Sequence, residues 1–303
     1  MGRMKGLVRW CMLIGSVLLA ACSNDGQGSY EPRYGAMPET ARPEYRFGIH
    51  PQRNPARLHA VFGPLVEYLN ARIPEVHFVF EASRHYDSFD EKVAARHFGF
   101  LLPNPYETLL ALDQGYRVFA KMGRDTDLRG LILVRRDSGI REVADLRGRA
   151  VSFPAPTALA ATMLPQYFLY NRGLDPRRDI EVRYVGSMES SLLNIQRGNV
   201  AAGTVYPPAW RMFLKERPEL ADDLMILWET EYLPDNSVMA RDDVPPELVA
   251  RVTQVLLGMQ EDPTGREVLA GMDTPRFETA DNTTYDPVRD FMRRYRAAFG
   301  PQE

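Results

Sequence analysis

SFPAPTALAAT, residues 152–162, combines the end of an apolar strand, a turn stiffened by two prolines and the first turn of a helix. Ligands of α/β sheets bind beyond the carboxyl ends of the strands, where the following helices begin. Between the strand and the helix this turn carries one hydroxyl side chain, that of Thr157, among alanines and a leucine. The sequence therefore predicts a site that holds its ligand mainly through main-chain amides and apolar contact.

Strand and helix patterns alternate on both sides of this turn. Strands are predicted at 45–50, 76–82, 98–102, 116–122, 130–138, 149–154, 180–186, 200–206 and 223–230. The expected helices begin at Pro55, Pro105, Ala158, Ser190 and Pro208. After residue 230 the chain is predicted to form only helices, at 245–259, 264–270 and 287–299. Pro64 is expected to kink the first helix. This alternation predicts an α/β fold of two lobes, with mixed sheets, helices on both faces and a ligand cleft between the lobes.

Polar or small residues follow six of the predicted strand ends, which we expect to border the cleft. These ends lie after Ile49, Ala82, Leu102, Phe153, Gly186 and Val205. The expected hinge segments are the strands near residues 127–131 and 228–233, where the chain crosses between the lobes.

The N-terminus predicts export and lipid anchoring. A short basic stretch is followed by the apolar run WCMLIGSVLLAA and then by LAAC, which ends at Cys22. This pattern predicts a signal peptide with a lipobox at 1–21, lipidation of Cys22 and a flexible tether at 22–43. Ser23 favours the outer membrane if the host is Gram-negative. The alternative is an ordinary signal peptide with a coincidental cysteine.

Composition narrows the remaining possibilities. The 303 residues are 45 % hydrophobic, so the chain is long enough for one large domain or two lobes. Its net charge of −3 gives no indication of a nucleic-acid partner. The two cysteines, Cys11 and Cys22, both lie at the N-terminus, so a hydrophobic core rather than disulfides must stabilise the body.

Four stretches of the sequence resemble the phosphate/phosphite/phosphonate-binding proteins of bacterial ABC transporters. They are GIHPQRNPARLHAVFGPLVEYLN, DSGIREVADLRGRAVSF, YVGSMESSLLNIQRGNVAA and LPDNSVMARDDVPPELVARV. The resemblance runs from about Tyr45 to the C-terminus. It implies a type II periplasmic binding fold, with a first lobe at 44–128, a second at 129–228 and a return segment with C-terminal helices at 229–303. It also implies a small-molecule ligand, a permease partner, a monomer in the cell envelope, and neither catalysis nor a cofactor.

The resemblance also yields candidate ligand-binding residues, with departures from the family pattern. Where the family reads approximately Asp-Pro-x-Ser-Thr-Ser-Gly, this chain has Ala155–Ala161, and Val200–Gly203 replaces Val-Asp-Ala-Ala. Met188 stands at the family's usual histidine. The missing hydroxyls argue against a charged phosphonate and favour an organic anion or a neutral, partly apolar molecule. The candidates are Tyr86, Asn104, Thr157, Ala158, Leu159, Ser187, Glu189 and Tyr206.

Five of the eight candidates also have a local structural explanation. Thr157, Asn104 and Ser187 could cap helices, Glu189 could favour a helix dipole, and Tyr86 could lie on the surface in a polar loop. The five histidines all fall between residues 50 and 97, which leaves open a metal site built from His50, His85 and Tyr86. No nucleophile, phosphate-loop or zinc motif supports an enzyme. The alternative function is a ligand-sensing or ligand-presenting envelope lipoprotein that is not coupled to transport.

Overall fold

The first lobe is built on a six-stranded sheet with the strand order β11-β4-β10-β3-β1-β2. The computed structural model describes residues 42–300, so the predicted signal peptide, Cys22 and most of the predicted tether lie outside the described residues. Strand β1 pairs in parallel with β2 and β3, whereas β10 pairs antiparallel with β3 and β4. The strands are β1 (Glu44–Ile49), β2 (His77–Ala82), β3 (Phe100–Leu102), β4 (Tyr116–Met122), β10 (Ser237–Arg241) and β11 (Phe277–Thr279).

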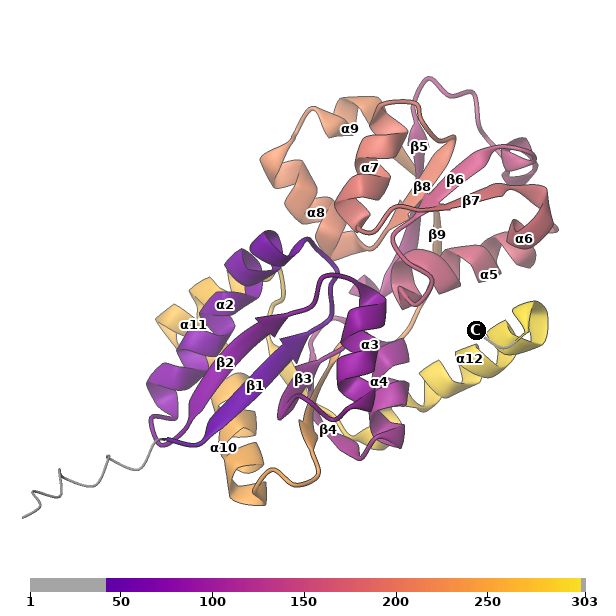
Figure 1. Cartoon of the computed structure of the whole chain (residues 1–303). Helices are drawn as coiled ribbons and strands as arrows, with labels where there is room; N and C mark the ends of the chain where they lie inside the picture. The colour runs from indigo at the N-terminus through magenta and orange to yellow at the C-terminus, as the bar shows by residue number, and fades with distance from the viewer. Residues whose placement is uncertain (1–41, 301–303) are drawn as a thin grey trace, which may run out of the picture. The chain divides into compact units, whose positions relative to one another are not determined.

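Helices cover both faces of this sheet (Figure 1). One face packs against α2 (Pro55–Arg72), α10 (Pro246–Leu257) and α11 (Pro263–Gly271). The other face packs against α3 (Tyr86–Ala94), α4 (Pro105–Asp113) and α12 (Asp286–Phe299). In β3, Phe100 and Leu102 face the first group while Leu101 faces the second, because side chains alternate along a strand. This burial on both faces explains why β3 is apolar throughout.

The second lobe is built on a five-stranded sheet with the order β7-β6-β8-β5-β9. Its strands are β5 (Arg129–Arg135), β6 (Ala150–Phe153), β7 (Glu181–Tyr184), β8 (Ala202–Val205) and β9 (Leu224–Tyr232). Strand β6 is parallel to β7 and β8, and β5 is antiparallel to β8 and β9. The helices are α5 (Leu164–Tyr170), α6 (Pro176–Asp179), α7 (Met188–Gln196), α8 (Pro207–Glu216) and α9 (Leu220–Asp223).

Two neighbouring segments carry the chain between the sheets. The outgoing segment contains the short 3-10 helix η1 (Asp125–Asp127), and the return segment follows β9. The Leu233 amide donates a hydrogen bond to the Leu128 carbonyl at 3.1 Å, so the two crossings lie side by side. Helix α12 packs on both α4 and α5, and its Tyr295 hydroxyl donates to Gln166 at 2.6 Å. The C-terminal helix therefore contacts both lobes.

Most predicted elements are present, with two corrections. The three helices predicted after residue 230 are present as α10, α11 and α12, but the same region also contributes the unpredicted strands β10 and β11 to the first sheet. Tyr86 begins a helix and is only 2 % exposed, rather than lying in a polar surface loop. Helix α2 contains Pro64 and continues to Arg72, and the kink expected at this proline stays a prediction. Across residues 42–300, no helix is both long and apolar enough to cross a bilayer.

Gly130 allows the start of β5 to lie directly against the turn at residue 160. A Cβ at this position would lie 2.6 Å from the Ala160 carbonyl oxygen and 2.6 Å from Pro165 Cγ. We expect Gly130→Ala to lower the free energy of unfolding by about 1–3 kcal/mol, because backbone rather than a flexible side chain must move. Urea denaturation of the purified protein measures this change.

The matched control is Gly271→Ala at the end of α11. A Cβ at Gly271 meets no atom within 4 Å, so this variant should be unchanged or more stable by up to about 1 kcal/mol. An unchanged stability of Gly130→Ala, or an equal loss in both variants, would contradict the predicted close approach.

Candidate ligand-binding site

A small cavity lies where the two lobes meet. It encloses about 260 Å³ of space between side chains, part of it open to solvent. All six predicted strand-end loops contribute to its wall, and the two crossing segments add Leu128 and Asn236. The lining residues are His50, Tyr86, Asn104, Leu128, Ala158, Leu159, Ala160, Ala161, Met188, Tyr206 and Asn236.

The turn at residues 152–162 forms one wall of this cavity. The chain leaves β6, and after Ala158 it enters a π-helical turn, η3 (Leu159–Met163), that continues into α5. The Ala158 carbonyl accepts hydrogen bonds from the amides of Thr162 and Met163. The amides from Leu159 to Ala161 therefore belong to the first turn, where a helix offers no acceptor of its own. Small alanine side chains leave these amides close to the cavity.

Asn104 joins the two lobes. Its Oδ1 accepts from the amides of Tyr106 and Glu107, and the Glu107 carboxylate accepts from the Asn104 amide, which completes a capping box at the start of α4. Its Nδ2 donates to the Thr157 carbonyl oxygen at 3.2 Å. The Thr157 hydroxyl does not cap η3; it is buried without a partner among the described residues. Asn104 is thus both a cap and an interlobe contact.

Two tyrosines from opposite lobes face the same cavity. Tyr206 precedes α8 and donates its hydroxyl hydrogen bond to Gln52 Oε1 of the first lobe. Burial raises its pKa above the usual tyrosine range. Tyr86 lies with its ring 6.4 Å from that of His50, and burial also raises its pKa. Both phenols are therefore uncharged at neutral pH.

Ser187 and Glu189 lie outside the lining of this cavity. Ser187 caps α7 by accepting from the Ser190 amide, while Met188 between them reaches the cavity. Glu189 lies 3.6 Å from Arg57 of α2, and Arg57 also pairs with Glu216 of α8. These ion pairs join the lobes at a solvent-exposed position. Their charges are screened there, so each pair adds little stability.

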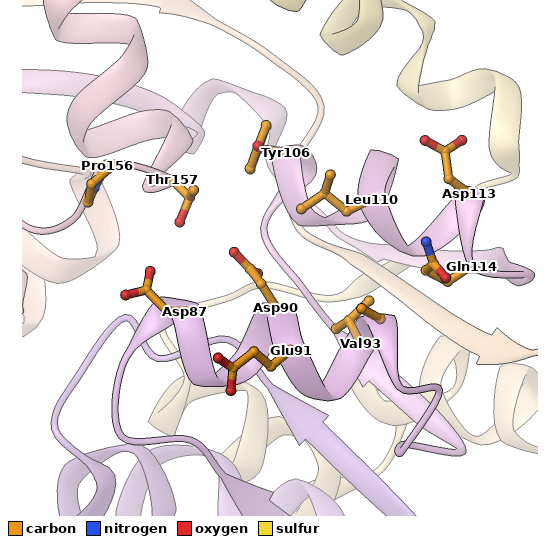
Figure 2. Close-up of a pocket in the computed structure, with 11 residues that line it drawn as sticks. Asp87, Asp90, Glu91, Val93, Tyr106, Leu110, Asp113, Gln114, Pro156 and Thr157 are labelled. Atoms are coloured by element: carbon orange, nitrogen blue, oxygen red, sulfur yellow. The ribbon is translucent and has the colours of Figure 1, made fainter. Parts of the chain in front are cut away.

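A larger pocket, of about 1150 Å³ including open solvent, lies between α3, α4 and the turn at residues 156–157 (Figure 2). Asp87, Asp90, Glu91 and Asp113 line it, and none of the four makes an ion pair within residues 42–300. In Figure 2, the carboxylates of Asp87 and Asp90 point from α3 toward Thr157. Burial and the charge of Asp87 raise the pKa of Asp90 to about 7. Acidic side chains without a cationic partner among the described residues therefore lie beside the smaller cavity.

The histidines considered for a metal site have local hydrogen-bond roles. His85 caps α3, where its Nδ1 accepts from the Ser88 amide at 3.2 Å. His50 Nδ1 lies 3.1 Å from the Leu102 carbonyl oxygen. Within residues 42–300 no group of three or more histidine, cysteine, aspartate or glutamate side chains is arranged to hold a metal ion.

Sequence reasoning missed two buried polar residues of the cavity as ligand contacts, His50 and Asn236. His50 was considered only as a metal ligand, although it directly follows β1, which is one of the predicted strand ends. Asn236 directly precedes β10, a strand that the sequence pattern did not predict. The position after a strand end was the available signal for His50. No comparable signal marked Asn236.

Residues 47–285 match the sequence model of a family described as the periplasmic substrate-binding protein of the phosphonate ABC transporter. The chain belongs to this family. Membership confirms the predicted resemblance and indicates a periplasmic or envelope location. The family is one of substrate-binding proteins rather than enzymes.

Solved structures show the same type II periplasmic binding fold. A binding protein of an ABC phosphonate transporter from Pseudomonas aeruginosa aligns with a TM-score of 0.78 and 15 % identity, over 85 % of this chain and 88 % of that chain. A Prochlorococcus marinus protein in complex with methylphosphonate gives 0.76 and 16 %, over 83 % and 97 %. The aliphatic sulphonate-binding protein of Escherichia coli gives 0.57 and 16 %, over 84 % and 88 %. These alignments confirm the predicted fold class.

A sensor histidine kinase is also similar in sequence to this chain. The tetrathionate sensor histidine kinase of Salmonella typhimurium is 26 % identical over 235 residues, which are 70 % of this chain. The aligned part is 39 % of the kinase, so the chain spans about two fifths of that relative's length. The chain is therefore similar in sequence to part of a sensor kinase as well as similar in structure to binding proteins of transporters.

Proposed function

We propose that this protein is a lipid-anchored solute-binding protein of an ABC importer that captures a small ligand by hinge closure. The observation that carries this proposal is the cavity between the lobes, to which all six strand-end loops contribute. Closure would occur about the two crossing segments, which the Leu233–Leu128 hydrogen bond holds together. The predicted lipobox at Cys22 supports anchoring in the envelope, with the outer membrane favoured in a Gram-negative host.

Five of the eight candidate residues support this cavity as the site: Tyr86, Asn104, Ala158, Leu159 and Tyr206. Thr157 contributes its carbonyl to Asn104, Glu189 lies near Arg57 of the other lobe, and Ser187 caps α7. The small volume of the cavity, which includes open solvent, favours a ligand of a few heavy atoms. The acidic pocket beside the cavity disfavours a multiply charged anion. We therefore favour a small organic molecule or a singly charged oxyanion over a dianion.

The relationship to a sensor kinase favours a second candidate function. The protein would close on the same kind of ligand and present it to a signalling partner in the envelope instead of to a permease. Growth of wild-type and deletion strains with the ligand as the sole nutrient source of its element separates the two candidate functions. Loss of uptake supports transport, whereas intact uptake with loss of a ligand-dependent transcriptional response supports sensing.

A thermal-shift screen tests ligand capture directly. Phosphate, phosphite, phosphonates, sulfonates, small carboxylates and neutral amides are compared for the rise in melting temperature that ligand binding produces by mass action. At 100 times its Kd, a ligand contributes about 2.7 kcal/mol to the free energy of unfolding. We expect saturable stabilisation by a small organic compound and a smaller radius of gyration in solution scattering. Stabilisation with an unchanged radius of gyration would contradict hinge closure.

A further inference from the structure

The wall of the interlobe cavity contains no lysine or arginine among the residues that the structure describes. Arg53, whose charge acts on Tyr206, donates instead to the sulfur of Met212, which is not part of the wall. An anion in this cavity would therefore rely on uncharged donors alone. Burial of a charge without a partner of opposite sign is strongly unfavourable.

His50 presents a hydrogen-bond acceptor to the cavity. It is 3 % exposed, and both its main-chain amide and its ring Nδ1 lie 3.1 Å from the Leu102 carbonyl oxygen. Because a carbonyl can only accept, Nδ1 must carry the proton. Burial lowers the pKa of His50 to about 4, so the ring is neutral at physiological pH. Its Nε2 is then an acceptor, and it has no partner within residues 42–300.

Asn236 presents a second acceptor. It is 1 % exposed, it lines the cavity, and its Oδ1 has no hydrogen-bond partner among the described residues. Its Nδ2 is directed toward Met122 Sδ at 3.8 Å, and its main-chain amide donates to Asp235 Oδ1. An acceptor that is buried without a donor costs about 1–3 kcal/mol. A ligand donor would remove that cost.

The cavity thus combines first-turn amide donors on one wall with two unpaired acceptors on the other walls. We propose that it selects ligands that carry an O–H or N–H donor and excludes fully deprotonated oxyanions, with His50 and Asn236 as the selecting residues. The inference rests on the proposed function, because it names the ligand class of the same site. A site built to accept a hydrogen bond from its ligand discriminates strongly against an analogue that lacks the donor.

Two isosteric pairs of probes test this selection by isothermal titration calorimetry. Acetamide and acetate are compared at pH 7.5, and methylphosphonate and methanesulfonate at pH 5.5. At that lower pH the phosphonate retains an O–H, since a phosphoryl group loses its second proton only at about pH 6. We expect the member with a donor to bind at least about tenfold more tightly in each pair, as the gain of one hydrogen bond implies. Tighter binding of acetate or methanesulfonate would overturn the inference.

Variants assign the selection to the two residues. His50→Phe and Asn236→Leu keep the approximate size and remove the acceptor, so each should reduce the preference within a pair about tenfold. If the two residues had only a structural role, each substitution would weaken the binding of both probes in a pair equally. That result would count against the inference. As a spectroscopic signature, the ¹⁵N resonance of His50 Nε2 should move when acetamide binds, whereas that of His85, which caps α3, should not.

The experiment also separates this inference from the proposed function. Acetate and methanesulfonate could bind more tightly than acetamide and methylphosphonate, and the cavity-filling substitution Ala160→Trp could abolish their binding. In that case the proposed selection is wrong and the interlobe cavity remains the site. If probe binding survives the cavity-filling substitution, the ligand site lies elsewhere, and both the inference and the proposed function are contradicted.

Discussion

The Ala160→Trp substitution is expected to abolish ligand-dependent stabilisation of this protein while leaving it folded. Ala160 lies in the first turn of η3 and lines the cavity. An indole would take up much of a cavity of about 260 Å³ that is partly open to solvent, so it would occupy the ligand's position. We expect the apparent Kd of any ligand found in the screen to rise at least about 100-fold, or about 2.7 kcal/mol. Calorimetric titration and thermal shift measure this.

A tryptophan on the surface provides the control. Ala270 lies in α11 and is exposed, so Ala270→Trp should bind ligand with the wild-type Kd. Circular dichroism at low temperature verifies that both variants are folded. Ligand binding by folded Ala160→Trp with an unchanged Kd would place the site outside the cavity. Equal loss of binding in both variants would mean that the effect is not specific to the cavity.

Asp235→Asn is expected to stabilise the protein at alkaline pH but not at acidic pH. Asp235 is 4 % exposed in the return crossing, and burial raises its pKa to about 7 from an ordinary value of 3.8. Between these values the unfolded chain is ionised at this position while the folded protein retains the proton. The contribution of Asp235 to the free energy of unfolding is therefore fully present below about pH 4 and is lost as the pH rises to about 7. That rise in pKa corresponds to about 4 kcal/mol.

Asparagine avoids this loss because it never ionises, and its side-chain oxygen can still accept from the Asn236 amide. Urea denaturation at pH 4, 6 and 8 should show a stability gain for Asp235→Asn that grows with pH. Asp243→Asn is the matched comparison: Asp243 is exposed and pairs with Arg241, which lowers the pKa of Asp243. This control should show no gain at pH 8. A gain for Asp235→Asn that does not depend on pH would refute ionisation as its cause.

Much of the candidate site's location could be predicted because strand ends are local features. Apolar runs that stop at a proline, glycine or polar residue marked the six loops, and each of them reaches the cavity wall. The turn at 152–162 was predicted to offer main-chain amides, and its alanines do line the cavity. Tyr86 was placed in a loop because SRHYDSF lacks a clear apolar period. Its helix α3 is a short one, whose buried positions Phe89 and Val93 pack on the first lobe's core.

The polarity of the cavity could not be predicted from the same patterns. Whether His50 is neutral depends on the Leu102 carbonyl of a neighbouring strand, and whether Asn236 Oδ1 is unpaired depends on every group around it. The pairing of Asn104 with Thr157 likewise requires the two lobes to meet. Such contacts join residues far apart in the chain, so no local pattern specifies them.

The sequence by itself determined the alternation of strands and helices, the strand ends that border the site and the family to which the chain belongs, because periodicity and turn residues act over a few neighbouring positions. Only the tertiary structure decided that β10 and β11 complete the first sheet, that Ser187 and Glu189 lie outside the cavity, and that His50 and Asn236 line it. Burial and hydrogen-bond pairing are properties of the assembled lobes, and they determine what the cavity can bind.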